Sequence, residues 1–387
     1  MLSVSTLCRH TEDRSTAVLV FFARGVYNQV NHHKGGIDMA IAREQGAALE
    51  GVLRLFFDEA TAPYQVINTS RDEADFRETV LVETEAGRRF VLKLADNDFT
   101  TPARIGMWQR TAEEYRALGY YCPRIYGARA GGFPTVEYGD RRYLCYAEDF
   151  AAYRSVADRA AGETEENGKA LAASCREAVW TMTAKIAVRR LDYTDFPSAY
   201  CLFETFSPGD EMDEVLENAR DWKQYAETLP AEFAEQVRRI WALWSENRAA
   251  LEAVYPQLPR SVFQADLNPT NLLVDDSGQF VGVFDFNLCG RDVFLNYLMR
   301  ENYGDFEAEL DLIFDALEIS ARNYPFSELE KETAPPLYRC LKPLAFTKLY
   351  RLKALGEDRA AVRAFLDKTE HYLTAPIDFA ARMAPSL

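Results

Sequence analysis

Histidine is scarce in this chain, and its few copies are unevenly placed. Three of the four histidines, His10, His32 and His33, lie before residue 39. Only His371 remains in the rest of the sequence. Neither a Ser-His-Asp triad nor a histidine-rich metal site is therefore expected.

Closely spaced cysteines and long apolar runs are also missing. The seven cysteines show no C-x-x-C spacing, so the sequence predicts neither a zinc site nor a disulfide framework. The longest strongly apolar run near the N-terminus, residues 17–23, is shorter than the roughly 20 residues that span a bilayer. Glu12 and Asp13 stand where a signal peptide has positive charge. We expect a cytoplasmic protein with no membrane partner.

Basic residues are outnumbered, with 44 Lys and Arg against 60 Asp and Glu and a formal net charge of -16. Binding a nucleic acid requires a basic face that releases counterions, so nucleic acid is disfavoured as a partner. A cationic substrate or a metal-bound nucleotide is easier to accommodate. The 387 residues, 48% of them hydrophobic, suffice for one large or two medium cores. The sequence does not indicate an oligomeric state.

The first part of the chain changes character twice. Residues 1–38 end in the tract NHHKGG and are expected to form a flexible extension. Residues 39–58 have the apolar spacing of a helix. Residues 78–96 predict a β-hairpin around a turn at 85–88, with Lys93 inside the second strand.

Helical periodicity then takes over. A helix is predicted at residues 104–118, and a strand at 141–151 passes into a linker. The clearest later amphipathic stretches are residues 178–191, 233–255 and 358–373. A strand-rich part followed by a longer helical part predicts an α+β fold with two lobes. We place the N-lobe at residues 39–148 and the helical C-lobe at residues 149–387.

One region interrupts the helical pattern with a second hairpin. Residues 272–274 and 280–286 predict two strands joined by a turn at 275–278. Asp266 and Asn271 precede this hairpin and Asp285 ends it, so the fold brings three polar groups to one end. Phosphoryl transfer uses such a set, because one carboxylate orients the nucleophile while an amide oxygen and a second carboxylate hold magnesium.

The motif D-L-x-P-x-N-L-L-V, followed by an apolar residue and D-F, resembles the catalytic and metal-binding loops of the protein-kinase-like fold. More narrowly, it is similar to the aminoglycoside phosphotransferase and choline kinase family. The tetrapeptide FVLK and a helix lie upstream in the order that this family has, so the similarity extends over residues 60–300. The resemblance implies a small β-rich N-lobe, a large helical C-lobe, and use of ATP and Mg2+.

The resemblance assigns roles to individual residues. It implies that Asp266 is the catalytic base or orients the acceptor hydroxyl. Asn271 and Asp285 would be magnesium ligands. Lys93 would contact the nucleotide phosphates.

Further nucleotide-binding residues are implied in the same way. Glu114 would hold Lys93 through an ion pair, with Glu113 as the alternative because the helix register is uncertain. Residues Tyr146 to Glu148 would form the hinge whose backbone groups receive adenine.

The sequence departs from the family pattern at two places. Gln264 and Ala265 replace the usual His-Gly pair before the catalytic aspartate, and a glutamine can make comparable hydrogen bonds. The nucleotide-covering loop should fall in residues 66–80, which contain no glycine to permit close backbone approach. Ser70 is the best remaining candidate in that loop.

The segment after Asp285 distinguishes branches of the fold. It enters a helical stretch almost directly, without the long activation segment of protein kinases, which favours a small-molecule acceptor over a protein. The acidic residue that the family often has in this helix corresponds to Asp292 or Asn296. Cys289 is expected to be a buried packing residue.

We therefore predict an ATP- and Mg-dependent kinase that phosphorylates a hydroxyl of a small molecule such as an aminoglycoside, choline or a sugar. One alternative is a catalytically inactive kinase-like binding protein, and another is an unusual protein kinase. The acidic residues 207–217 suit a cationic acceptor, but a solvated helix start capped by Asp210 or Asp213 is the favoured interpretation.

Overall fold

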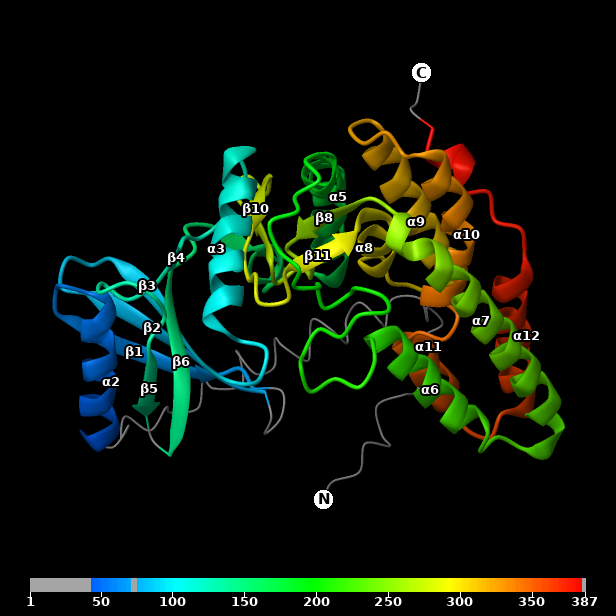
Figure 1. Ribbon diagram of the computed structural model, residues 1–387, viewed down its shortest axis with the longest axis horizontal. Helices are drawn as coiled ribbons and strands as arrows, with labels where there is room; N and C mark the ends of the chain where they lie inside the picture. The colour runs from blue at the N-terminus through cyan, green and yellow to red at the C-terminus, as the bar shows by residue number, and fades with distance from the viewer. Residues whose placement is uncertain (1–42, 71–74, 139, 385–387) are drawn as a thin grey trace.

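The computed structural model describes residues 43–70, 75–138 and 140–384. The extension predicted at residues 1–38 lies outside the described residues, as does Cys8. Within them the chain forms two lobes joined side by side (Figure 1). The predicted α+β class with a β-rich first lobe and a helical second lobe is confirmed.

The N-lobe is built on one antiparallel sheet with the strand order β1-β2-β3-β6-β4, and β5 pairs with β6 at one end. The hairpin predicted around residues 85–88 is present as β2 and β3. The strands are β1 (Thr61–Asn68), β2 (Phe76–Thr84), β3 (Arg89–Asp96), β4 (Ile125–Tyr126), β5 (Thr135–Tyr138) and β6 (Arg141–Asp149).

The two faces of this sheet serve different cores, because successive side chains of a strand point to opposite faces. Helix α2 (Arg43–Phe56) covers the outer face and forms a small apolar core with it. Leu53 of the helix and Leu92 and Leu94 of β3 are almost completely buried there. Lys93 lies between those leucines and therefore faces the other side of the sheet.

Helix α3 (Pro102–Ala117) lies on that inner side. It begins after Thr101, whose side chain accepts the backbone N–H of Arg104, and Pro102 occupies the first turn, where a missing N–H costs nothing. Its buried residues, Trp108 and Tyr115 among them, belong to the large core of the C-lobe and not to the core under α2. Helix α3 therefore packs into the larger core, which also includes Tyr146 of β6.

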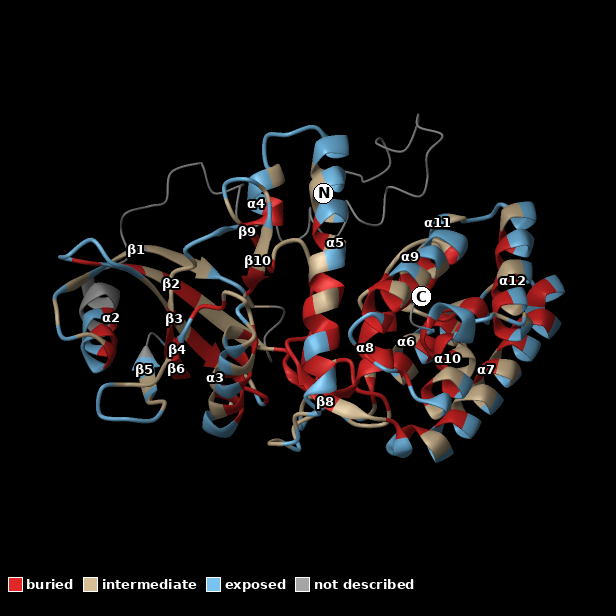
Figure 2. Cartoon of the chain, turned by 90° about the horizontal axis from the view of Figure 1, so that it is seen from above, coloured by how far each residue is buried: buried red, intermediate tan, exposed pale blue. Residues whose placement is uncertain are grey.

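The C-lobe is mainly helical, and its buried residues gather where the helices meet (Figure 2). The stretches 178–191, 233–255 and 358–373 lie largely within α5, α7 and α12, as predicted. The helices are α4 (Val156–Ala160), α5 (Glu165–Val188), α6 (Glu214–Ala226), α7 (Ala234–Val254), α8 (Phe294–Arg300), α9 (Phe306–Ala321), α10 (Glu328–Leu341), α11 (Phe346–Ala354) and α12 (Arg359–Thr374). Among the described residues, none of the helices combines the length and apolarity that crossing a membrane requires.

Two small sheets interrupt the helices beside the N-lobe. The predicted second hairpin is present as β9 (Leu272–Val274) and β10 (Phe280–Val283), and β7 (Arg154–Ser155) pairs with β9. The second sheet pairs β8 (Arg260–Phe263) with β11 (Gly290–Val293).

A close backbone contact ties the chain after α3 to this hairpin. The N–H of Tyr121 donates to the carbonyl of Val281 at 2.8 Å, and Tyr121 accepts from the N–H of Val283 at 3.0 Å. Gly282 permits this approach, because a Cβ there would lie 1.8 Å from the Tyr121 carbonyl oxygen.

Candidate active site

Strained backbone marks the loops at the end of the second hairpin. Ala265, Asp266 and Asp285 have φ angles of 52°, 111° and 65°, in the left-handed region that non-glycine residues rarely adopt. Each such residue costs on the order of 1–3 kcal/mol and persists only where surrounding contacts hold it. Such strain clusters at functional sites, and here it falls on the two predicted loops.

The structure brings Asp266 and Asn271 into direct contact. The side-chain amide of Asn271 donates to a carboxylate oxygen of Asp266 at 3.0 Å and to the Asp266 carbonyl at 3.1 Å. The amide of Asn268 donates to the other carboxylate oxygen. Because the nitrogen of Asn271 is turned toward Asp266, its oxygen remains the acceptor that can face a cation.

Asp285 lies beside these residues through the pairing of the hairpin. The N–H of Phe284 donates to the Asn271 carbonyl at 3.2 Å, so the chain reaches Asp285 next to Asn271. In the described part of the chain, the Asp285 carboxylate forms no hydrogen bond or ion pair. Carboxylate and amide oxygens are the donors that Mg2+ prefers, so the residues present fit this ion.

Gln264, in the loop before Asp266, is hydrogen-bonded to the loop that carries Asp285. Its side chain is completely buried, and its amide nitrogen donates to the carbonyls of Phe284 at 2.9 Å and Asp285 at 2.8 Å. The prediction that glutamine can supply the support usually given by histidine is consistent with these bonds. They fix the backbone on both sides of the strained Asp285.

Glu301, which sequence reasoning missed, holds the catalytic loop from the opposite side. One of its carboxylate oxygens accepts the N–H of Asp266 at 2.7 Å and the other accepts that of Leu267 at 3.0 Å. Burial, assisted by the nearby charge of Asp266, raises the pKa of Glu301 to about 8, while the two N–H donors oppose this rise. Glu301 follows the end of α8 and belongs to no motif, so no sequence signal could have identified it.

The inner face of the N-lobe sheet supplies the other half of the site. Lys93 pairs with Tyr146 on β6 and with Thr79 on β2, so these side chains share one face. Glu148 is two residues beyond Tyr146 and lies on the same face. Burial raises the pKa of Glu148 to about 7, Lys93 lowers it, and Asp285 raises it. Lys93 from the N-lobe and Asp285 from the C-lobe are thus both charges that act on Glu148.

The predicted partner of Lys93 on α3 is wrong. Glu114 forms an ion pair with Arg189 of the C-lobe at 2.8 Å, and the alternative, Glu113, lies 3.9 Å from Arg116 on its own helix. The reason is the packing of α3, which faces the sheet with apolar residues such as Trp108, whose ring lies 5.8 Å from that of Tyr146.

The predicted hinge residues, Tyr146 to Glu148, lie inside β6. Ala147 and Glu148 pair with β3 on one side and with β4 on the other, whereas Tyr146 pairs with β3. The connection between the lobes begins after Asp149, at residues 150–153.

Ser70 lies where the nucleotide-covering loop was predicted, between β1 and β2. Its hydroxyl accepts the N–H of Arg77 at 2.8 Å and donates to the Arg77 carbonyl at 3.2 Å. These bonds close the hairpin and engage the side chain. Residues 71–74 of this loop lie outside the described residues.

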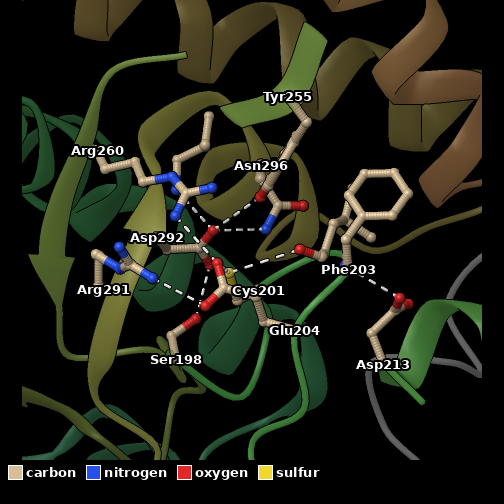
Figure 3. A network of polar contacts seen from close by, with 12 residues as sticks. Ser198, Cys201, Phe203, Glu204, Asp213, Tyr255, Arg260, Arg291, Asp292 and Asn296 are labelled. Carbon is tan, nitrogen blue, oxygen red and sulfur yellow. Dashed lines mark hydrogen bonds and ion pairs between the residues drawn. The ribbon is translucent and has the colours of Figure 1, made fainter. Parts of the chain in front are cut away.

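Asp292 and Asn296, which follow Asp285 in the chain, belong to a buried polar network (Figure 3). Asp292 is completely buried, and its carboxylate accepts from Ser198 at 2.7 Å, from Asn296 at 2.8 Å and from Tyr255 at 3.2 Å. Beside it, Glu204 forms ion pairs with Arg260 and Arg291. Burial raises the pKa of Asp292 in spite of its hydrogen bonds.

The acidic residues 207–217 form a capped helix start. The Asp213 side chain accepts the N–H of Leu216 at the beginning of α6 and pairs with Arg248. Glu214 pairs with Arg300 at 2.6 Å. The capping interpretation is thus confirmed for Asp213. Cys289 is completely buried, as predicted, and the other cysteines among the described residues are buried too.

A surface pocket of about 470 Å³ lies elsewhere, at the far end of the C-lobe, where His371 and Arg382 help to line it. None of the predicted site residues lines this pocket.

A model of the phosphotransferase enzyme family matches residues 68–295. The chain belongs to this family. The matched part of the phosphotransferase runs from the last residue of β1 into α8, and so contains both hairpins and the loops described above. The family resemblance expected from the sequence is confirmed.

One solved structure has a similar fold, and two others resemble the chain less closely. A microcompartment-associated aminopropanol kinase shares 15% identity and a TM-score of 0.51 with the phosphotransferase, covering 84% of this chain and 95% of its own. An amicoumacin kinase in complex with AMP-PNP, Ca2+ and Ami gives 16% identity and a TM-score of 0.48, covering 88% and 99%. An aminoglycoside phosphotransferase from Alicyclobacillus acidocaldarius gives 15% and 0.42, covering 86% and 91%. No curated protein sequence matches the chain.

Proposed function

We propose that this phosphotransferase is an ATP- and Mg-dependent kinase that phosphorylates a hydroxyl group of a small molecule. The observation that carries the proposal is the contact between Asp266 and Asn271, formed beside Asp285. Together with Lys93 on the N-lobe sheet, these residue types stand in the chain order that phosphoryl transfer requires.

Each group has a distinct part in this reaction. Asp266 orients the acceptor hydroxyl and accepts its proton, and Asn271 and Glu301 keep Asp266 in its strained conformation. Asn271 and Asp285 would hold Mg2+, which when bound neutralises charge on the phosphates. Lys93 contributes positive charge from the N-lobe. Catalysis then rests on positioning and electrostatic stabilisation, with no covalent enzyme intermediate.

The chain path after Asp285 supports a small acceptor. Strand β11 begins at Gly290 and α8 at Phe294, so no activation segment separates them from Asp285. The aminopropanol kinase of similar fold also acts on a small molecule, as its name says. We infer a cytoplasmic location, because the described cysteines are free and buried.

Two features favoured the inactive alternative, namely Gln264 in place of the usual histidine and a nucleotide-covering loop without glycine. In the structure, the residues at both places form hydrogen bonds. Gln264 bridges both loops, and the glycine-free hairpin is closed by Ser70. We therefore retain the enzyme as the proposal.

The proposal is tested by thermal unfolding of the full chain with ATP, in the presence and absence of Mg2+. A ligand that binds only the folded state at about 100 times its Kd stabilises by roughly 2.7 kcal/mol. We expect an Mg-dependent rise of the melting temperature that Asp285→Asn abolishes. The matched control is Asp276→Asn, an exposed residue of the same hairpin turn, which should retain the rise.

No rise with the unaltered chain, or an undiminished rise in Asp285→Asn, would contradict the proposal. A positive result justifies screening amines, aminoglycosides and sugars as acceptors. Asp266→Asn should then bind nucleotide normally but lose transfer by about 10²–10⁴-fold.

A further inference from the structure

The strand register defines what lies beside Lys93. In the antiparallel pair of β3 and β6, Lys93 stands opposite Tyr146 and Val91 stands opposite Glu148. Lys93 and Glu148 are thus diagonal neighbours on the same face. Diagonal positions lie roughly 7–8 Å apart, which long side chains can bridge.

Other carboxylates near this face are already engaged or assigned. Glu114 pairs with Arg189 and Glu113 lies by Arg116. Asp285 lies at the end of the second hairpin, where it is the proposed magnesium ligand. Of these acids, Glu148 is the one that shares the sheet face with Lys93.

Glu148 is also unusual for a carboxylate. It retains only 9% exposure, and a buried carboxylate is costly unless a charge or hydrogen bonds compensate it. The described residues offer its side chain no hydrogen bond. Lys93 is the cation whose charge favours the ionised form of Glu148, whereas Asp285 and Asp149 oppose it.

We propose that Glu148, contributed by strand β6, is the residue that positions Lys93 for the nucleotide, in place of a carboxylate on helix α3. This inference rests on the proposed function. Glu148 is a positioning residue, since it acts through Lys93 and forms no part of the transfer itself.

The arrangement has a specific consequence for metal binding. Glu148 is acted on by charges from both lobes, Lys93 and Asp285. When Glu148 is ionised, it holds the lysine on the sheet and leaves Asp285 available to the cation. When Glu148 is made neutral, Lys93 turns toward Asp285 and competes with Mg2+ there.

The test compares the nucleotide affinity of single and double variants of the full chain. Glu148→Gln keeps the size of the side chain and removes the charge. We expect it to raise the Kd for ATP by about tenfold, the size of effect that loss of one charge-assisted contact produces. It should also raise the Mg2+ concentration required for half-maximal binding. Glu148→Asp keeps the charge and should lose less affinity.

Two comparisons separate positioning from a merely structural role. In a Lys93→Met background, Glu148→Gln should change the Kd by less than about twofold, because contacts that act through one partner are not additive. Glu137→Gln, an exposed glutamate on the neighbouring strand β5, is the matched control and should leave the Kd and the Mg2+ requirement unchanged.

The outcomes also separate this inference from the proposed function. If the unaltered chain binds ATP with Mg2+ but Glu148→Gln does so equally well, the role of Glu148 is refuted and the kinase assignment stands. That role is likewise refuted if Glu148→Gln weakens binding equally with and without Lys93, or if Glu114→Gln produces the larger loss. If the unaltered chain binds no nucleotide, both proposals fail.

Discussion

The two halves of the candidate site differ in how many hydrogen bonds hold their backbone. On the C-lobe side, Gln264, Asn271 and Glu301 each donate or accept two hydrogen bonds that fix the strained loops, and the side-chain oxygen of Gln264 is left without a partner among the described residues. On the N-lobe side, the buried hydroxyl of Thr79 has no partner among the described residues, and Glu148 compensates its charge only at a distance.

The backbone of the two halves is therefore held in different ways. The loops around Asp266 adopt a costly backbone, so they need dense support from within the fold. The regular strands beneath Lys93 carry no such strain and leave their side chains available to a ligand. Mutations on the C-lobe side should therefore lower the stability of the protein, whereas those on the N-lobe side should affect nucleotide binding alone.

The largest effect is expected from Gln264→Leu. The substitution leaves the partly buried carbonyls of Phe284 and Asp285 without their donor, at up to about 1–3 kcal/mol for each. We expect a loss of about 3 kcal/mol in the free energy of unfolding, measured by urea denaturation, and loss of Mg-dependent nucleotide binding. Gln257→Leu, at an exposed position, is the control. If the two variants are equally stable, the loops on the C-lobe side do not depend on the hydrogen bonds of Gln264.

The backbone contact between Gly282 and Tyr121 is a second place where the stability of the C-lobe side can be tested. Gly282→Ala places a methyl group against a carbonyl oxygen, and such overpacking costs about 1–3 kcal/mol. Gly106→Ala in helix α3 meets no atom within 4 Å and should instead stabilise the protein by about 0.5–1 kcal/mol. Thermal unfolding of both variants shows whether each substitution raises or lowers the stability of the protein. A stabilising Gly282→Ala would show that the lobes are not held at this contact.

The pH dependence of stability should reveal Glu301. Because burial raises the pKa of Glu301 to about 8, the folded chain holds a proton that the unfolded chain releases near pH 4.3. Its contribution to stability is complete below that value and is lost as the pH rises toward 8. We expect a loss of about 1–2 kcal/mol between pH 5 and 8, discounted for the partial exposure of the residue.

Glu301→Gln should flatten this part of the stability profile, and the exposed control Glu166→Gln should not. The rate of phosphoryl transfer should change in the opposite direction, because only the ionised carboxylate accepts fully from both Asp266 and Leu267. A profile that is the same in all three proteins would contradict the support that we ascribe to Glu301.

The smallest effect concerns a matched pair of threonines. The Thr111 hydroxyl donates to the Met107 carbonyl and lies 2.7 Å from the Tyr193 hydroxyl, whereas the Thr79 hydroxyl has no described partner. Thr111→Val should lower the free energy of unfolding by about 1 kcal/mol, and Thr79→Val should leave it unchanged or raise it slightly. A loss of stability in Thr79→Val would mean that the fold uses this hydroxyl after all.

The sequence was sufficient to predict the features that depend on local residue patterns. Both hairpins were predicted because alternating residues flank a recognisable turn, and the order of Lys93, Asp266, Asn271 and Asp285 carried the family resemblance. The predicted boundaries differ from the observed ones by a few residues, as at α3, which starts at Pro102 and not at 104.

What failed depended on contacts between distant parts of the chain. The helical phase placed Glu114 at the border of a packed face, but its partner Arg189 lies 75 residues away, so the pattern could not show which lobe would receive it. Glu301 holds a loop 35 residues earlier in the chain. The strand predicted at residues 141–151 is present as β6, and only the structure shows that its residues Ala147 and Glu148 also pair with β4.

The attachment of Tyr121 to β10 bears on how the lobes can move. The chain meets this small sheet twice. After α3, Tyr121 bonds to β10 before the chain returns to the N-lobe strand β4, and after β6 the chain enters β7, which pairs with β9. Both contacts therefore lie on one sheet, β10-β9-β7. A rotation of one lobe against the other would pivot about this sheet. Asn271 and Asp285 lie next to that pivot and would barely shift, while Lys93 would travel farther as the lobes open and close.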